Sequence, residues 1–152
     1  MDVLFRSVRE LVERAETEGK LISELMIEQE MLISGRTREE IFAQMDRNLT
    51  VMEEAVERGL RGVQSVTGLT GGDAVLLQNY IKQGKSLAGD LLLDAVSKAV
   101  ATNEVNAAMG TICATPTAGS AGVVPGTLFA VQNKLNPTRE QMIRYLFTSG
   151  AF

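Results

Sequence analysis

The residues from Cys113 to Gly126 are the part of this sequence whose types and spacing most clearly suggest chemistry. They read CATPTAGSAGVVPG and contain the only cysteine, two of the three prolines and three of the glycines in the 152-residue chain. A Gly/Pro/Thr/Ser segment between helices exposes backbone amides and a thiol where a ligand can meet them. We therefore expect any site in this chain to lie here.

Two interpretations of this segment remain open from the residues alone. The run from Thr115 to Gly122 offers hydroxyls and consecutive amides just before a helix, a combination that binds carboxylate or phosphate. The other interpretation is a tight connection in which Gly and Ala let two helices pack closely. Likewise, a single cysteine such as Cys113 is most often a small buried hydrophobic residue.

Composition limits the classes of protein to which the chain can belong. A net charge of -4, with the 15 Lys and Arg residues interspersed among acids, leaves no basic stripe suited to nucleic acid. A lone cysteine forms no internal disulfide, no apolar run reaches about 18 residues, and the chain starts directly in a charged amphipathic pattern. We therefore expect one domain in a cytoplasmic protein that binds neither nucleic acid nor membrane.

The elements that must position this segment are helices, because apolar residues recur at helical spacing and no alternating run indicates a strand. The fold class expected is all-α: a compact multi-helix domain with the Gly/Pro-rich loop between helices. The expected helices run from about residue 4 to 19, 20 to 34, 37 for at most about 30 residues, 73 to 84, about 86 into the Cys113 loop, 125 to 135, and 136 onward.

Local signals place several of these helix ends. Thr37 and Glu40 match a capping box, Asp73 can cap a short helix, and Pro125 suits a first turn. The helix from about Ser86 is nearly apolar on two faces and is expected to be central and buried. Its expected core-facing residues are Leu87, Leu91, Leu92, Ala95, Val96, Ala99 and Val100. Lys85 and Lys98 are expected at helix surfaces, so neither is predicted to form a Schiff base.

Two segments resemble a known family. NEVNAAMGTICATPTAGSAGVVPG, from Asn103 to Gly126, and TGLTGGDA, from Thr67 to Ala74, resemble the α chain of the bacterial iron-sulfur-dependent L-serine dehydratases. The resemblance covers the whole chain but about half of a family α chain. It implies that residues 1–152 are the N-terminal part of the α-chain catalytic domain and that the rest of that domain lies outside them.

The resemblance implies a reaction and its participants. L-serine would be converted to pyruvate and ammonia without pyridoxal phosphate, in amino-acid catabolism and gluconeogenesis, by a cytoplasmic heterodimer with a β chain. A 4Fe-4S cluster held by three cysteines would act as the Lewis acid. Cys113 would be one ligand and the other two would lie outside this sequence, so these residues by themselves are expected to bind no cluster and to be inactive.

The resemblance also implies a substrate site. The loop residues Thr115, Thr117, Ala118, Gly119 and Ser120 would cradle the serine carboxylate, and Asn103 and Asn106, three apart on one helix face, would hydrogen-bond its polar groups.

Two departures from the family bear on these roles. The chain has no histidine, so the general base must come from elsewhere, and some relatives place a ligand cysteine at the position matching Ala121.

The alternative function is a non-catalytic helical module for subunit interaction or small-acid binding.

Overall fold

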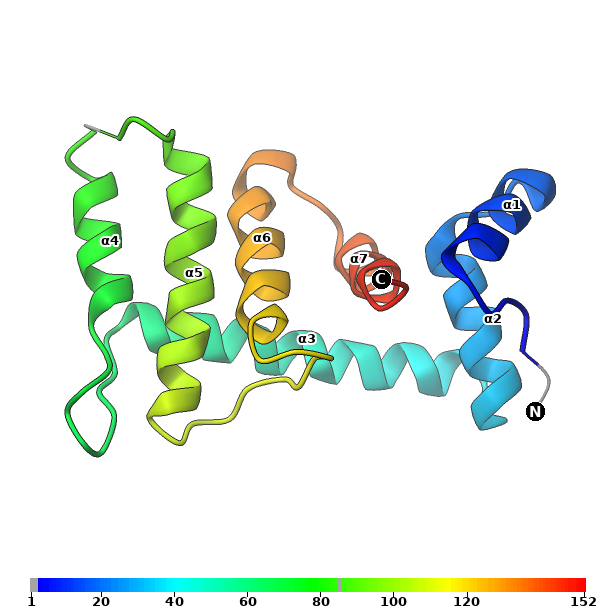
Figure 1. Ribbon diagram of the computed structural model, residues 1–152, viewed down its shortest axis with the longest axis horizontal. Helices are drawn as coiled ribbons and strands as arrows, with labels where there is room; N and C mark the ends of the chain where they lie inside the picture. Colours follow the sequence, from blue (N-terminus) through cyan, green and yellow to red (C-terminus); the bar gives the residue numbers. More distant parts are fainter. Residues whose placement is uncertain (1–2, 85) are drawn as a thin grey trace. The chain divides into compact units, whose positions relative to one another are not determined.

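A computed structural model describes residues 3–84 and 86–152, and these form seven helices and no strand. The all-α prediction is therefore confirmed, while the prediction for Lys85 lies outside the described residues. The helices are α1 (Val8–Glu18), α2 (Ile22–Ser34), α3 (Arg38–Leu60), α4 (Asp73–Ile81), α5 (Asp90–Ala107), α6 (Ser120–Leu135) and α7 (Arg139–Ser149) (Figure 1). None of the helices within these ranges has the length and apolar character needed to cross a bilayer.

The described chain divides into two compact units. The first comprises the residues up to Arg47 together with Pro137–Phe152, and the second comprises Asn48–Asn136. The whole candidate loop and both asparagines of the predicted site belong to the second unit.

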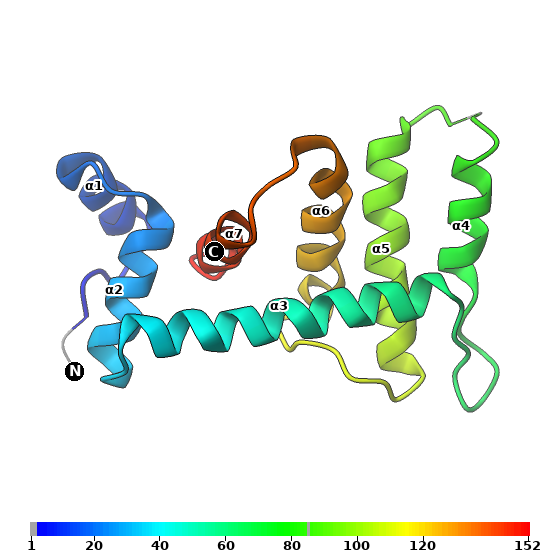
Figure 2. The same ribbon diagram turned by 180° about the vertical axis from the view of Figure 1, so that it is seen from behind.

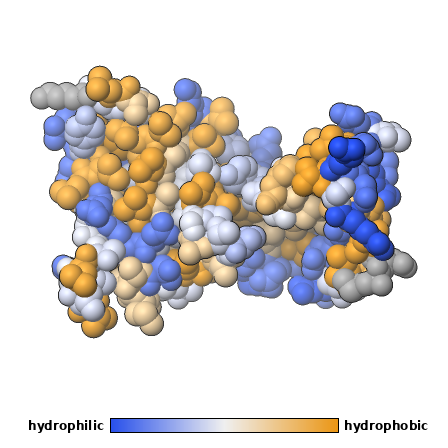
Figure 3. All heavy atoms as spheres, viewed as in Figure 1, coloured by the Kyte–Doolittle hydropathy of each residue, from blue (hydrophilic) through white to orange (hydrophobic). Residues whose placement is uncertain are grey.

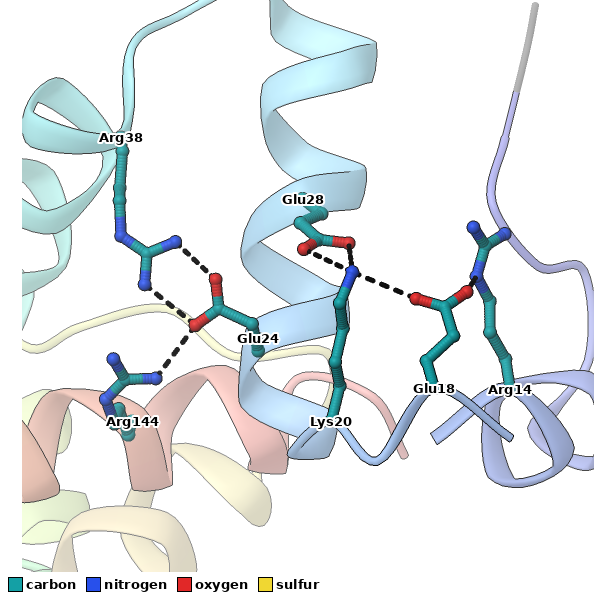
Figure 4. A network of polar contacts seen from close by, with 7 residues as sticks. All are labelled: Arg14, Glu18, Lys20, Glu24, Glu28, Arg38 and Arg144. Atoms are coloured by element: carbon teal, nitrogen blue, oxygen red, sulfur yellow. Dashed lines mark hydrogen bonds and ion pairs between the residues drawn. The ribbon is translucent and has the colours of Figure 1, made fainter. Parts of the chain in front are cut away.

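In the first unit, α2 packs against α1 and α7. Glu24 on α2 receives hydrogen bonds from Arg38 on α3 and from Arg144 on α7, the latter at 3.1 Å (Figure 4). Both guanidinium groups also lie over the ring of Phe42, at 5.3 Å for Arg38 and 5.8 Å for Arg144. One carboxylate therefore ties three helices together.

The helix ends in this unit follow their local signals. Gly19 and Gly35 end α1 and α2 with φ of 62° and 69°, the left-handed region that glycine adopts without strain. Before α3, the Thr37 amide donates to Glu40 Oε2 at 2.9 Å and the Glu40 amide donates to Thr37 Oγ1 at 3.3 Å. The predicted capping box is confirmed.

In the second unit, α4, α5 and α6 lie side by side, and α5 contacts both of the others (Figures 1 and 2). The α5–α6 pair packs closely because α6 presents glycines to α5. A Cβ on Gly126 would lie 2.8 Å from the Ala95 carbonyl oxygen, and one on Gly122 would lie 2.6 Å from that of Ala99. Any larger residue at either glycine would push the two helices apart.

The prediction for α5 is partly wrong. The helix begins at Asp90, four residues later than expected, and it is central without being buried along its apolar side: Leu87, Leu91, Leu92 and Val96 are all exposed. The buried residues of α5 are instead Ser97, Lys98, Ala101, Thr102, Glu104 and Val105. Polar residues are buried here because each finds a specific partner.

Lys98 shows why. The sequence predicts it at the surface, yet it is only 9% exposed, and its Nζ donates to Asp94 Oδ2 at 2.5 Å and to the Phe129 carbonyl oxygen at 2.7 Å. An ion pair and a hydrogen bond to α6 make this burial tolerable. Lys98 also lines a cavity of about 520 Å³ bordered by α3, α5 and α6.

Two other helix starts differ from prediction, whereas α3 ends at Leu60, within the length expected for it. Gly72 and not Asp73 is the N-cap of α4, and α6 begins at Ser120. Pro125 therefore lies inside α6, where it is fully buried, and not in the first turn of the helix. The candidate loop leads directly into this earlier start of α6.

Candidate functional site

The candidate loop occupies residues 108–119, between the end of α5 at Ala107 and the start of α6 at Ser120. Its first turn is fixed by the Gly110 amide, which donates to the Val105 carbonyl oxygen at 2.8 Å. A Cβ on Gly110 would lie 2.6 Å from Val105 Cγ1 and 2.8 Å from Arg58 Nη1. A side chain at position 110 would therefore crowd Val105 where the chain leaves α5.

A cluster of three hydroxyls organises the far end of the loop. The Thr117 amide donates to Ser120 Oγ and the Ser120 amide donates to Thr117 Oγ1, both at 3.1 Å. Thr115 Oγ1 lies 2.6 Å from Ser120 Oγ. This reciprocal Thr117–Ser120 exchange closes a turn directly before α6, whose N-cap, Gly119, has no side-chain hydrogen bond, and α6 starts five residues before Pro125.

The two amides between Thr117 and Ser120 are available donors directly before α6. The Ala118 and Gly119 amides make no hydrogen bond to any described residue, and both residues are exposed. They lie at the N-terminal end of α6, where the helix dipole places partial positive charge. Chemically, this arrangement can receive a carboxylate or another small anion.

Asn103 and Asn106 share an exposed face of α5, as predicted, while Glu104 and Val105 between them are buried. The side-chain amide of Asn103 lies against the first turn of α6. A Cβ on Gly122, in that turn, would lie 2.9 Å from Asn103 Nδ2. The structure thus brings Asn103 to the helix end that carries the free amides. No hydrogen bond joins the Asn106 side chain to the described loop residues.

Cys113 carries a half-buried thiol whose Sγ lies 3.8 Å from the Ala114 carbonyl oxygen. Burial raises the pKa of this thiol above its usual value. Within residues 3–84 and 86–152, no group of three His, Cys, Asp or Glu side chains is placed to hold a metal ion. The loop therefore supplies one thiol and not a complete metal site.

One polar residue of the site region escaped prediction. Glu104 is 3% exposed, and its Oε1 accepts a hydrogen bond from the Asp73 amide at 2.7 Å. A glutamate inside a helix ordinarily indicates a solvated face, and periodicity carries no signal of a partner 31 residues away. The link from Glu104 to Asp73 could be found only in three dimensions.

Comparison with known proteins identifies the family. The serine dehydratase alpha chain family model matches residues 17–152. The chain is 72% identical over 149 residues to a probable L-serine dehydratase, alpha chain, of Bacillus subtilis (strain 168), covering 98% of this chain and 50% of that protein. It is 35% identical over 148 residues to the L-serine dehydratase, alpha chain, of Peptoniphilus asaccharolyticus, covering 96% of this chain and 50% of that protein.

A more distant relative is the L-serine dehydratase TdcG of Escherichia coli (strain K12), 30% identical over 153 residues that cover 97% of this chain and 33% of that protein. No solved structure matches the chain. The chain spans about half the length of the alpha chains that it matches. Because the family model covers nearly all of its residues, the chain belongs to the serine dehydratase alpha chain family.

Proposed function

We propose that this chain is part of an iron-sulfur L-serine dehydratase, in which residues 1–152 form the N-terminal part of the α-chain catalytic domain. The enzyme would convert L-serine to pyruvate and ammonia in the cytoplasm, as a heterodimer of α and β chains. Family membership supports the reaction class. The observation that carries the site is the pair of free amides at the start of α6, beside Asn103.

The loop would bind the carboxylate of serine. The Ala118 and Gly119 amides would donate to it, while Thr115, Thr117 and Ser120 hold those amides in place through their mutual hydrogen bonds. In this proposal the three hydroxyls mainly hold the shape of the loop, whereas the sequence suggested that these residues contact the carboxylate directly. Asn103 and Asn106, whose side chains are exposed, would orient the remaining polar groups of the substrate.

Cys113 would contribute one ligand to a 4Fe-4S cluster. The described residues do not by themselves fit such a cluster, because they offer a single thiol where the family uses three. Ligation requires the thiolate, and burial favours the protonated thiol of Cys113. The remaining ligands would have to come from sequence outside these 152 residues. A histidine acting as the base on the serine Cα proton would also have to come from outside them, since the chain contains no histidine.

The test uses a complete α chain containing these residues, reconstituted anaerobically with its β chain. We expect Cys113→Ala to lose the visible absorbance of the cluster and serine-dependent pyruvate formation. Val123→Ala, at an exposed position of α6, serves as the control and should retain both. A Cys113→Ala enzyme that keeps absorbance and activity would exclude Cys113 as a ligand.

A second candidate function is a non-catalytic helical module for subunit interaction, and one observation favours it. Apolar side chains gather over α4 and α5, where Leu76, Leu91, Leu92 and Val96 are exposed (Figure 3). Exposed apolar patches of this kind often mark contact surfaces. If interaction were the whole function, Leu92→Glu would abolish partner binding, whereas Ser120→Ala would leave the partner's activity unchanged.

A further inference from the structure

Glu104 physically joins the two segments on which the family resemblance rests. It belongs to the Asn103–Gly126 segment, and its Oε1 accepts a hydrogen bond from the backbone amide of Asp73, which belongs to the Thr67–Ala74 segment. The bond is 2.7 Å long and the side chain is only 3% exposed. A buried, charge-assisted hydrogen bond between distant segments is a strong constraint on their geometry.

At α4, this carboxylate does the work of an N-cap. Asp73 is the first residue of the helix, and the N-cap Gly72 provides no side-chain hydrogen bond. The first amides of any helix lack acceptors within the helix, and negative charge is favoured at that end. Glu104, on α5, supplies both the acceptor and the negative charge. A second hydrogen bond joins the same two helices, because Ser97 Oγ on α5 donates to the Ala74 carbonyl oxygen on α4 at 3.2 Å.

The other oxygen of Glu104 is buried without a protein donor. Oε2 has no hydrogen-bond partner among the described residues. A carboxylate oxygen only accepts hydrogen bonds, and leaving one buried without a donor is costly. Oε2 therefore calls for a donor small enough to occupy an enclosed polar position, and a water molecule meets that requirement.

We propose that Glu104 is a positioning residue that clamps the N-terminus of α4 onto α5, with an ordered water molecule on Oε2. Because Glu104 lies between Asn103 and Asn106, the clamp also fixes the stretch of α5 that leads into the candidate loop. Its effect on serine binding rests on the proposed function, whereas its effect on the Asp73 amide does not.

The first test measures hydrogen exchange of the Asp73 amide in the 152-residue chain by NMR. Glu104→Leu removes the acceptor and should accelerate this exchange about tenfold or more. Glu104→Gln keeps Oε1 as an acceptor and offers an amide that can donate to the same water, so exchange should stay near the wild-type rate. The control, Glu54→Leu on an exposed position of α3, should change nothing.

Two results would overturn the proposal. Unchanged exchange in Glu104→Leu would disprove the clamp, and a Glu104→Gln chain as damaged as Glu104→Leu would show that Oε2 does not bind water. If Glu104→Leu fails to fold, Glu104→Ala removes the acceptor with a smaller side chain, and Glu104→Gln retains it. A melting temperature that is the same for these two variants then takes the place of the first result and disproves the clamp.

The second test measures serine kinetics in the reconstituted enzyme. Glu104→Leu should raise KM for serine by about tenfold with a smaller change in kcat, since a shifted Asn103 weakens substrate positioning, and Glu104→Gln should restore KM. A wild-type enzyme without serine dehydratase activity would refute the proposed function and leave the exchange result standing. An active Glu104→Leu enzyme with unchanged KM would refute the positioning role.

Discussion

Thr117 and Ser120 exchange hydrogen bonds, each backbone amide donating to the other's side-chain oxygen at 3.1 Å. This exchange closes the turn that holds the Ala118 and Gly119 amides at the start of α6. The two residues therefore connect the stability of a helix end with the shape of a candidate anion site.

The first prediction concerns this exchange. Ser120→Ala removes the Oγ that accepts from the Thr117 amide, so we expect the free energy of unfolding to fall by about 1 kcal/mol. Urea denaturation would measure the loss, and amide exchange should increase at Ala118–Val123. Thr127→Ala, which deletes a hydroxyl bonded to the Val123 carbonyl oxygen within the same helix, is the control. Equal losses in the two variants would contradict a special role for Ser120.

The second prediction concerns pH and Glu24. The hydrogen bond from Arg38, helped by Arg144, lowers the pKa of Glu24 from 4.5 to about 2. Because the folded pKa is lowered, the ionised carboxylate stabilises the fold fully above about pH 4.5, and this contribution is lost as the pH falls toward 2.

Glu24→Gln should therefore destabilise the chain by about 1–2 kcal/mol at pH 7, and the difference from wild type should shrink as the pH falls from 4.5 toward 2. Thermal melts across this range would measure it. Glu30→Gln, on the same helix, is the control for loss of a carboxylate from α2. A Glu24→Gln difference that stays constant with pH would show that the carboxylate charge is not the cause.

The third prediction concerns the close packing of α5 and α6. Gly126→Ala would place a Cβ 2.8 Å from both the Ala95 carbonyl oxygen and the Ala99 amide nitrogen, so the helices must separate. We expect a loss of about 1–3 kcal/mol in the free energy of unfolding. Gly119→Ala is the matched control, because a Cβ there meets nothing within 4 Å and its φ of -66° suits alanine. A neutral Gly126→Ala would mean that the interface adjusts freely.

Sequence predicted those parts of the fold that depend on near neighbours. The αL glycines Gly19 and Gly35 and the Thr37–Glu40 capping box are local devices, and all three lie where expected. The helix start predicted from Pro125 was wrong because proline favours a first turn without being confined to it. α6 instead begins at Ser120, directly after the turn that the Thr117–Ser120 exchange closes. Competing local signals can be ranked only when the hydrogen bonds are known.

The burial of α5 could not be predicted because it depends on distant partners. Lys98 and Glu104 are buried by contacts to Phe129 and Asp73, each 31 residues away in sequence. Leu92 is exposed because no described element covers its side of the helix. At the candidate site, the sequence predicted a loop between two helices, and the structure has one between α5 and α6, whose binding role stays a prediction. Which loop hydroxyls hydrogen-bond to one another could be read only from the geometry.

The last prediction concerns the reactivity of Cys113. Burial raises the pKa of its thiol, so less thiolate is present at pH 8 than in an unfolded chain. Alkylation by iodoacetamide at pH 8 should be at least about threefold slower in the native chain than in the same chain in urea, since both access and ionisation are reduced. The native rate should still rise with pH where the rate in urea has levelled off. Equal native and unfolded rates would mean that the Cys113 thiolate is freely accessible, and the loop would then need no further change to present it to a metal.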